Sequence, residues 1–344
     1  MSLPLVAVAF EPDPEVKEAL IASLQTHAEV CFLPGLDEAA RAAAFDRARA
    51  VIVRVLNRDL VAGATSRTGD KLVQRDVGGG ELSRAGGKLI QTMIAGVDMI
   101  PFDQVPDDVL VAHNGGAFGL QMAEHIVGMI LAARKDLFAR HTALQRGEWI
   151  QWSPATRELL GSTALIVGFG GIGKATTNLL RAFGVSIMAL NRSGQTDEPV
   201  DFVGTLNDLN DVLPRADIVV LCAGLNAETR GLIDAGRLSR MKDDAVLVNV
   251  ARGPVIVEAD LYAHLVAHPS FWACLDTWWG EPFAERRFTA NFPFIELPNV
   301  LGSPHNSAVT GNYMRRAAGH AAANVVRYLQ TGQADRLVTA ADMP

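Results

Sequence analysis

The regular alternation of apolar strands and helical stretches after Ser162 constrains the fold more than any other feature of the chain. Short apolar runs occupy residues 163–168, 185–190, 217–221, 245–250, 271–275 and 299–302. Helical stretches separate some of them, for example at 172–183 and 258–267. A helix between two strands returns the chain to the same end of the sheet, so this half predicts a parallel, doubly wound sheet.

The first hundred residues repeat this alternation less regularly. We expect strands at 5–10, 50–53 and 88–91 and a helix at 14–26, which has Pro14 in its first turn. A chain of 344 residues has room for two domains. The expected fold class is therefore α/β, with two Rossmann-like doubly wound domains and a cleft between them.

Two further segments carry structural predictions. Residues 63–87 are rich in Gly, Ser, Arg and Asp, and a connection of this length is usually a functional lid or a mobile insertion. We predict a mobile flap that tunes substrate choice, and the alternative is a disordered surface loop. Residues 120–145 show one long helical pattern that is apolar on more than one face, with Gly128 and several alanines permitting close approach. We expect this helix to form the interface of a homodimer, and the alternative is a helix buried entirely within one chain.

Composition excludes several classes of protein. The formal charge is −7, which argues against a nucleic-acid surface. The three cysteines form no C-x-x-C pair, so no zinc site or other metal centre is expected and a reducing compartment fits best. The apolar run 126–133 is too short to cross a membrane, and the N-terminus has no basic region of the kind that begins a signal peptide. We therefore expect a soluble, cytoplasmic protein.

A glycine motif follows the first strand of the second half. The strand ends at Val167, and the next residues are Gly168, Phe169, Gly170, Gly171, Ile172 and Gly173, which form G-x-G-x-x-G before a helix. The first glycine permits a tight turn, the second lets a pyrophosphate approach the backbone, and the third lets helix and strand pack closely. With both flanks correct, dinucleotide binding is favoured over a glycine-rich turn without a ligand.

The end of the next strand bears on which dinucleotide is bound. An NAD site usually has Asp or Glu at this point, but this chain has Asn191, Arg192 and Ser193, with no acid before Asp197. Arginine and serine suit a 2′-phosphate. We predict that NADP(H) is the preferred cofactor and NAD(H) the alternative.

Three chemically capable side chains follow strands of the same sheet. Arg252 comes after the strand at 245–250, Glu281 after that at 271–275, and His305 after that at 299–302. The carboxyl ends of parallel strands meet at one edge, so we expect an anion binder, a carboxylate and a titratable acid/base near the cofactor.

With these residues in place, the chain resembles the D-2-hydroxyacid dehydrogenase family over nearly its full length. The resemblance rests on motifs in matching order and spacing: Ala123-Glu124-His125, the glycine loop, Asn249-Val250-Ala251-Arg252-Gly253, Asp276 with Glu281-Pro282, and Pro304-His305. It implies a substrate-binding (catalytic) domain at 1–113, completed by a C-terminal helix at 308–344, and a dinucleotide-binding domain at 114–307.

The same resemblance implies roles for individual residues. Arg252 would hold the carboxylate and carbonyl of a small 2-oxo acid, His305 would be the acid/base, and Glu281 would stabilise its imidazolium. The backbone at Ala95 and Gly96 would hold the substrate carboxylate. The residues implied for the cofactor are Gly168, Gly170, Gly171, Ile172, Gly173, Asn191, Arg192, Ser193, Ala251 and Asp276.

Alternatives to a glyoxylate/hydroxypyruvate reductase-like enzyme stay open at this point. A formate dehydrogenase of the same superfamily would carry Gln at position 281, so Glu281 counts against it. Phosphite oxidation would use a similar triad. A nucleotide-sensing interaction module of the same fold would keep the triad and show negligible turnover.

Overall fold

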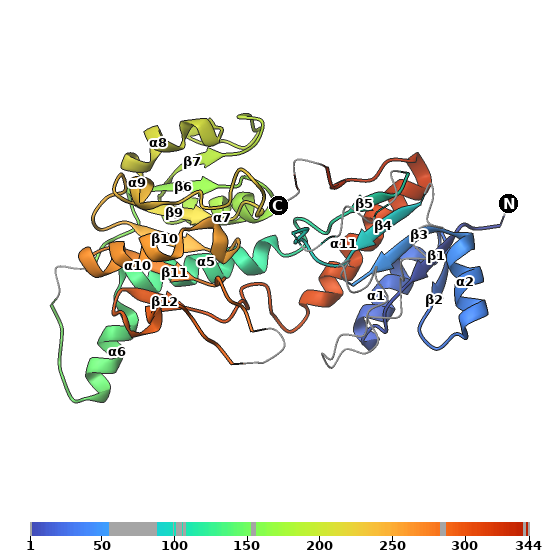
Figure 1. The fold of residues 1–344 in the computed structure, drawn as a ribbon, viewed down its shortest axis with the longest axis horizontal. Helices are drawn as coiled ribbons and strands as arrows, with labels where there is room; N and C mark the ends of the chain where they lie inside the picture. The colour runs from blue at the N-terminus through green and yellow to red at the C-terminus, as the bar shows by residue number, and fades with distance from the viewer. Residues whose placement is uncertain are drawn as a thin grey trace. The chain divides into compact units, whose positions relative to one another are not determined.

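The computed structural model describes residues 2–54, 88–98, 100, 105, 108–152, 156–282, 287–339 and 342, which leaves the predicted 63–87 flap outside the described residues. The chain divides into two compact units. Unit 1 consists of Met1–Ala117 and Gly311–Met343, and unit 2 consists of Phe118–Thr310 with Pro344. Each unit has its own sheet (Figure 1).

The sheet of unit 1 is parallel, in the order β2-β1-β3-β4-β5. Its strands are β1 (Leu5–Val8), β2 (Glu29–Phe32), β3 (Ala48–Val53), β4 (Leu89–Thr92) and β5 (Leu110–Ala112). Three of them match the predicted strands at 5–10, 50–53 and 88–91 to within two residues at each end. The edge strand β2 was not predicted.

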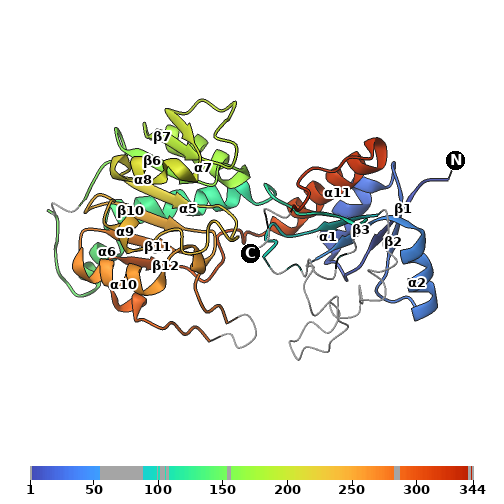
Figure 2. The ribbon, with the colours of Figure 1, turned by 45° about the horizontal axis from the view of Figure 1, so that its top comes forward.

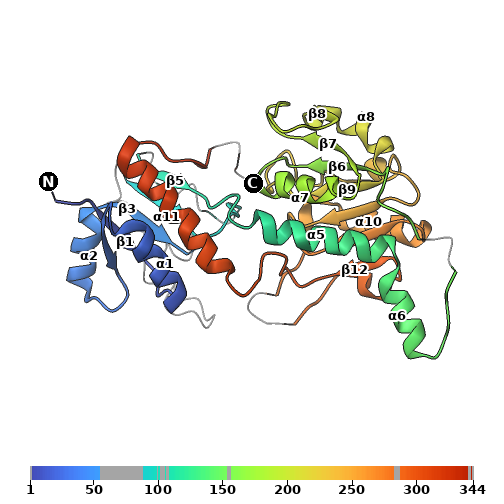
Figure 3. The same ribbon diagram turned by 180° about the vertical axis from the view of Figure 1, so that it is seen from behind.

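Helices cover both faces of this sheet. They are α1 (Pro14–Leu24), α2 (Glu38–Arg47) and α11 (Tyr313–Thr331). On one face, Phe45 of α2 joins a buried cluster with Leu5 and Ala7 of β1. On the other face, α1 and α11 lie side by side, and α11 contacts β3 and β4 (Figure 3). The last long helix of the chain therefore belongs to the first sheet.

A short C-terminal segment extends unit 1 beyond its edge strand. Leu337 forms an antiparallel bridge with Ala112 at the end of β5. The His113 N–H donates to the Arg336 carbonyl at 3.0 Å. Arg336 adopts a left-handed backbone conformation, with φ 58°. These contacts hold the end of β5 and the residue after it, His113, against the C-terminal segment.

The sheet of unit 2 is parallel and ordered β12-β11-β10-β9-β6-β7-β8. Its strands are β6 (Thr163–Val167), β7 (Ser186–Leu190), β8 (Phe202–Gly204), β9 (Ile218–Leu221), β10 (Val246–Asn249), β11 (Trp272–Leu275) and β12 (Val300–Gly302). All but β8 were predicted, to within one residue at each end. The fold class of two parallel α/β sheets is confirmed.

Side chains that alternate along these strands divide the core of unit 2 into two layers. Ile166 and Val220 pack in one layer with α5 (Gly119–Arg134) and α7 (Gly171–Arg181), which lie side by side in Figure 3. The opposite layer includes buried residues of α8 (Leu209–Val212), α9 (Ala235–Leu238) and α10 (Glu258–Ala267), seen in Figure 2. Short 3-10 turns occur at Leu206–Asp208, Leu213–Arg215, Gly253–Val255 and Phe294–Glu296.

The single helix expected at 120–145 is wrong. The chain forms α5, which ends at Arg134, and then α6 (Leu137–Gln145). Asp136 between them is left-handed, with φ 53°, a conformation that Asp tolerates and that a continuous helix does not. The Arg134 guanidinium donates to the carbonyls of Asp217 at 2.8 Å and Asp244 at 3.2 Å, which anchors the end of α5.

No helix in the described part of the chain has both the length and the apolar character needed to cross a membrane.

Candidate active site

The glycine loop lies where the direction of the sheet order reverses. From β6 the chain continues outward through β7 and β8, and then returns to start β9 on the other side of β6. In open α/β sheets, ligands bind at the carboxyl ends of strands at this point. Gly168 follows β6 with φ +101°, and a Cβ there would lie 2.4 Å from the backbone nitrogen of Ala223, which follows β9. Only glycine fits at Gly168.

The other glycines have distinct surroundings. A Cβ on Gly173 would lie 2.5 Å from the Gly168 carbonyl oxygen, so this glycine lets α7 pack on the turn. A Cβ on Gly170 would meet nothing within 4 Å. Gly170 is the N-cap of α7, and Gly171 and Ile172 supply the first N–H groups of that helix. The open backbone and the helix start fit a dinucleotide pyrophosphate.

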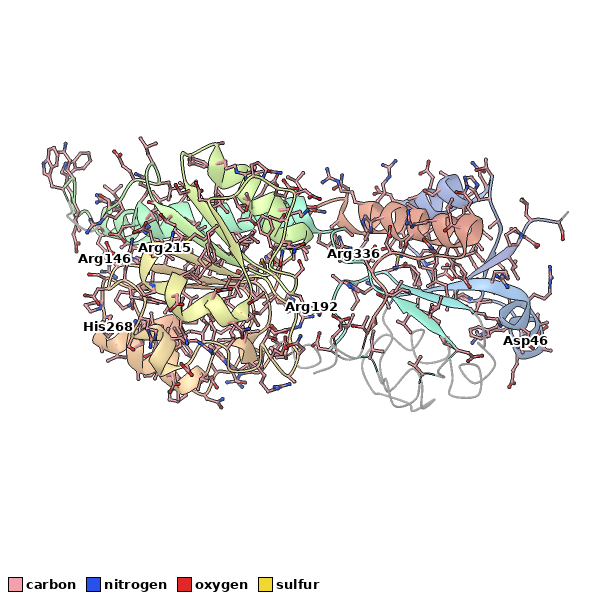
Figure 4. The ribbon with its side chains drawn as sticks, turned by 90° about the horizontal axis from the view of Figure 1, so that it is seen from above. Asp46, Arg146, Arg192, Arg215, His268 and Arg336 are labelled. Carbon is pink, nitrogen blue, oxygen red and sulfur yellow. The ribbon has the colours of Figure 1, made fainter. Side chains whose placement is uncertain are left out.

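The segment after β7 is closed by the side chain of Asn191. Its Oδ1 accepts from Gly194 N–H at 2.7 Å and from Ser193 Oγ at 3.1 Å. Its Nδ2 donates to the Gln195 carbonyl at 2.8 Å. Asn191 and Ser193 thus shape a turn that contains Arg192, and Figure 4 labels this arginine on the surface of unit 2. This turn carries an arginine where an NAD site usually has an acid.

A buried asparagine fixes the turn that carries Arg252. Asn249 ends β10, and its Nδ2 donates to the Arg252 carbonyl at 2.9 Å. Its Oδ1 accepts from Ala251 N–H at 3.0 Å. A Cβ on Gly253 would lie 2.2 Å from the Trp278 carbonyl carbon, so the turn is also pressed against the segment after β11. Arg252 is held between these two constraints.

Glu281 and His305 form an ion pair or hydrogen bond across neighbouring strand ends. His305 Nδ1 lies 2.8 Å from Glu281 Oε2, with the histidine side chain 32% and the glutamate 13% exposed. The second oxygen, Oε1, accepts from Trp278 N–H at 3.0 Å. His305 has a left-handed backbone, with φ 51°. A fixed carboxylate therefore orients the imidazole.

Asp276 holds the segment that contains His305. Its carboxylate is fully buried and accepts from Ser303 Oγ at 2.6 Å, Asn306 N–H at 3.0 Å and Ser307 N–H at 3.2 Å. Its carbonyl accepts from His305 N–H at 2.8 Å. Asp276, expected at the cofactor, is thus also a structural anchor.

Ala95 and Gly96 lie in unit 1, in the turn after β4, and both are partly exposed. The Asn114 N–H donates to the Ile94 carbonyl at 2.9 Å, which ties this turn to the end of β5. Burial lowers the pKa of the nearby His113 imidazole, and a hydrogen bond to the Ala95 backbone opposes that shift. The turn is therefore supported by buried polar groups.

Among the residues that the structure describes, no group of three or more His, Cys, Asp or Glu side chains could hold a metal ion.

Ser303 and its hydrogen bond to His125 were not predicted from the sequence. The structure brings His125 Nε2 of α5 to 3.0 Å from Ser303 Oγ. The available signals were the position of Ser303 two residues before His305 and the place of His125 in a family motif.

Comparison with known proteins identifies the family. Residues 127–307 match the model of the D-isomer specific 2-hydroxyacid dehydrogenase, NAD binding domain. The chain belongs to the D-isomer specific 2-hydroxyacid dehydrogenase family. It is therefore an oxidoreductase of a family that interconverts 2-oxo and 2-hydroxy acids with a nicotinamide cofactor, and the predicted family is confirmed.

Individual family members resemble the chain to different extents. It is 31% identical over 223 residues to a hydroxypyruvate reductase from Thermotoga maritima, covering 64% of this chain and 71% of that one. It is 34% identical over 230 residues to a glyoxylate reductase from Thermofilum pendens, covering 64% and 66%. The chain spans about two thirds of these relatives and less than half of some longer ones.

A solved structure shows the same fold along almost the whole chain. It is a D-isomer specific 2-hydroxyacid dehydrogenase from Xanthobacter autotrophicus Py2 in complex with NADPH and MES, with 24% identity and a TM-score of 0.72. The likeness covers 98% of both chains. At this identity it shows that the family fold extends over both units.

Proposed function

We propose that the protein reduces a small 2-oxo acid to the D-2-hydroxy acid, and catalyses the reverse, with NADP(H) preferred over NAD(H). The observation that carries the proposal is the 2.8 Å pairing of His305 Nδ1 with Glu281 on a sheet edge that also carries the glycine loop. A histidine oriented by a carboxylate is suited to exchange a proton with a substrate oxygen.

Two residue groups would bind the substrate. Arg252 carries a permanent charge and can hold a carboxylate together with a neighbouring carbonyl. The backbone N–H groups of Ala95 and Gly96 in unit 1 would hold the carboxylate as well. On this assignment unit 1 is the substrate-binding domain and unit 2 the dinucleotide-binding domain. Fixing the substrate by its carboxylate would orient its carbonyl for reaction.

His305 would exchange the proton. In reduction, the imidazolium donates from Nε2 to the carbonyl oxygen, since Nδ1 is engaged by Glu281. The negative charge of Glu281 stabilises the imidazolium before transfer. In oxidation, the neutral imidazole accepts the hydroxyl proton.

Residues of unit 2 fit the cofactor. The segment from Gly168 to Gly173 would hold the pyrophosphate, and Arg192 the 2′-phosphate, within the turn shaped by Asn191 and Ser193. Ala251 and Asp276 would lie at the nicotinamide end. NADPH, when bound, supplies the hydride.

A homodimer in a reducing, cytoplasmic compartment is part of the proposal. Several large apolar side chains on α6 and the segment after it are exposed, with Trp149 at 79% and Trp152 at 85%. A second copy of the chain would cover them. Light scattering at micromolar concentration should give the mass of two chains, and the mass of one chain would refute the dimer. The compartment is inferred from three cysteines that are all free.

The function is tested with a panel of glyoxylate, hydroxypyruvate, pyruvate, phenylpyruvate and branched 2-oxo acids, each with NADPH and NADH. We expect turnover of at least one acid, with a product that is the D isomer. His305→Asn should lower kcat by orders of magnitude and leave cofactor affinity nearly unchanged. Arg252→Ala should damage KM and kcat together. Near-normal activity of either variant refutes the assigned roles, and no turnover across the panel favours a nucleotide-sensing module.

A further inference from the structure

Asp276, a buried residue, accepts four hydrogen bonds from the segment that carries His305. Hydrogen bonds from residues 303, 305, 306 and 307 all end on Asp276, three on its carboxylate and one on its carbonyl. A left-handed backbone at a residue with a Cβ costs about 1–3 kcal/mol and persists only where its surroundings impose it. The bonds to Asp276 impose the φ of 51° at His305.

The Ser303 hydroxyl makes the shortest of these bonds. Its Oγ lies 2.6 Å from Asp276 Oδ1, a distance typical of an O–H donor to an ionised carboxylate. The hydroxyl proton therefore points to Asp276, and the Ser303 oxygen is left as an acceptor. The His125 Nε2, 3.0 Å away, must be the donor to it.

His125 connects this network to a helix. It lies on α5, and its Nε2 is also within 3.8 Å of Asp276 Oδ1. The Asp276 side chain is fully buried, so each lost hydrogen bond to it leaves part of a charge without compensation. A change at Ser303 or His125 should therefore alter the hydrogen bonds with which Asp276 holds the backbone on both sides of His305.

We propose that Ser303 and His125 are positioning residues for His305: the Ser303 hydroxyl, fixed by His125, completes the bonding of Asp276 and so keeps His305 in register with Glu281. The inference rests on the proposed function, in which His305 is the acid/base. It assigns a role to two side chains whose hydrogen bonds lead to His305 through Asp276.

The central test compares Ser303→Ala with Ser303→Thr, which restores a hydroxyl. Ser303→Ala should lower kcat by about tenfold, and Ser303→Thr should recover most of it. KM for the 2-oxo acid should change little in Ser303→Ala, because Arg252 and the backbone of Ala95 and Gly96, rather than His305, would hold the substrate carboxylate. Ser239→Ala, which removes a hydroxyl bonded to the Gly236 carbonyl at 2.9 Å, is the matched control and should change neither quantity.

A second variant, His125→Phe, keeps the test informative if Ser303→Ala is poorly folded, and a double-mutant cycle measures the coupling if both variants fold. His125→Phe keeps an aromatic ring and removes the donor, and should lower kcat a few-fold with KM again little changed. If both act through one hydroxyl, His125→Phe should add nothing to Ser303→Ala. Additive effects on kcat, or a lower Tm with unchanged kcat and KM, overturn the proposal. An active His305→Asn would instead overturn the proposed function, so the two failures are distinguishable.

Discussion

The turn after β7 allows a quantitative prediction about cofactor preference. In this turn Arg192 stands where an NAD site usually has an acid. A hydrogen bond to a charged group contributes about 1.5–3 kcal/mol. One arginine contact to the 2′-phosphate therefore favours NADPH by about ten- to a hundredfold. Arg192→Ala should weaken NADPH binding by that factor and leave NADH binding nearly unchanged.

Variants of Asn191 separate the charge of the turn from its shape. Asn191→Asp keeps the oxygen that accepts from Gly194 and Ser193, loses the donor to Gln195, and adds a negative charge. It should shift preference toward NADH by repelling the 2′-phosphate and by pairing with the ribose hydroxyls. Asn191→Ala loses all these bonds and should weaken both cofactors to similar extents.

The assay is fluorescence titration of NADPH and NADH against each purified variant, with kcat/KM measured for both. Arg215→Ala is the matched control, because this arginine lies elsewhere on unit 2, over the ring of Phe202 (Figure 4). It should leave the NADPH to NADH ratio unchanged. If the unmodified protein uses NADH with equal or higher kcat/KM than NADPH, the interpretation of this turn is wrong.

Three further predictions concern stability and reactivity. Gly253→Ala should destabilise the protein by about 1–3 kcal/mol and lower activity, because the added Cβ would lie 2.2 Å from the Trp278 carbonyl carbon. The control is Gly319→Ala in α11, where the added Cβ would meet nothing within 4 Å and should be tolerated. Equal urea midpoints for the two variants would contradict this prediction. Burial lowers the pKa of His264 to about 4 in the native protein, from 6.5 for a free histidine. Between these two pH values the unfolded chain binds a proton at His264 and the native chain does not. The free energy of unfolding should therefore fall as the pH falls through this window. His264→Phe should reduce this fall in Tm, and an unchanged slope would exclude His264 as its source. Burial raises the pKa of Cys222 and Cys274 to about 12, so Ellman's reagent at pH 8 should titrate Cys31 alone in the native protein and all three thiols after denaturation.

The strands of unit 2 could be predicted because most of them are buried on both faces and read as continuous apolar runs. The edge strand β2 has only partly buried side chains and an exposed Glu29, and α2 buries Phe45 alone. Their periodicity was therefore too weak to detect. The break at Asp136 was missed for a different reason: the apolar pattern continues across it, and the left-handed turn depends on tertiary anchoring of Arg134.

The candidate site was likewise only partly predictable from the sequence. Arg252, Glu281 and His305 could be assigned to one sheet edge because parallel strands fix where their ends meet. The hydrogen bond between His125 and Ser303 joins residues 178 positions apart, and no local pattern indicates it. The use of Asn191 and Ser193 to close a turn likewise depends on backbone geometry that residue types alone do not specify.

The return of α11 to the first sheet has a consequence for the order of folding. Unit 2 is contiguous from Phe118 to Thr310 apart from the final residue, whereas unit 1 needs a segment that begins at Gly311. During synthesis, unit 2 can therefore form its core while unit 1 still lacks the helix that covers β3 and β4. Residues 1–117 leave the ribosome before unit 2 but are completed after it, and their uncovered sheet face is the surface that a chaperone would need to protect.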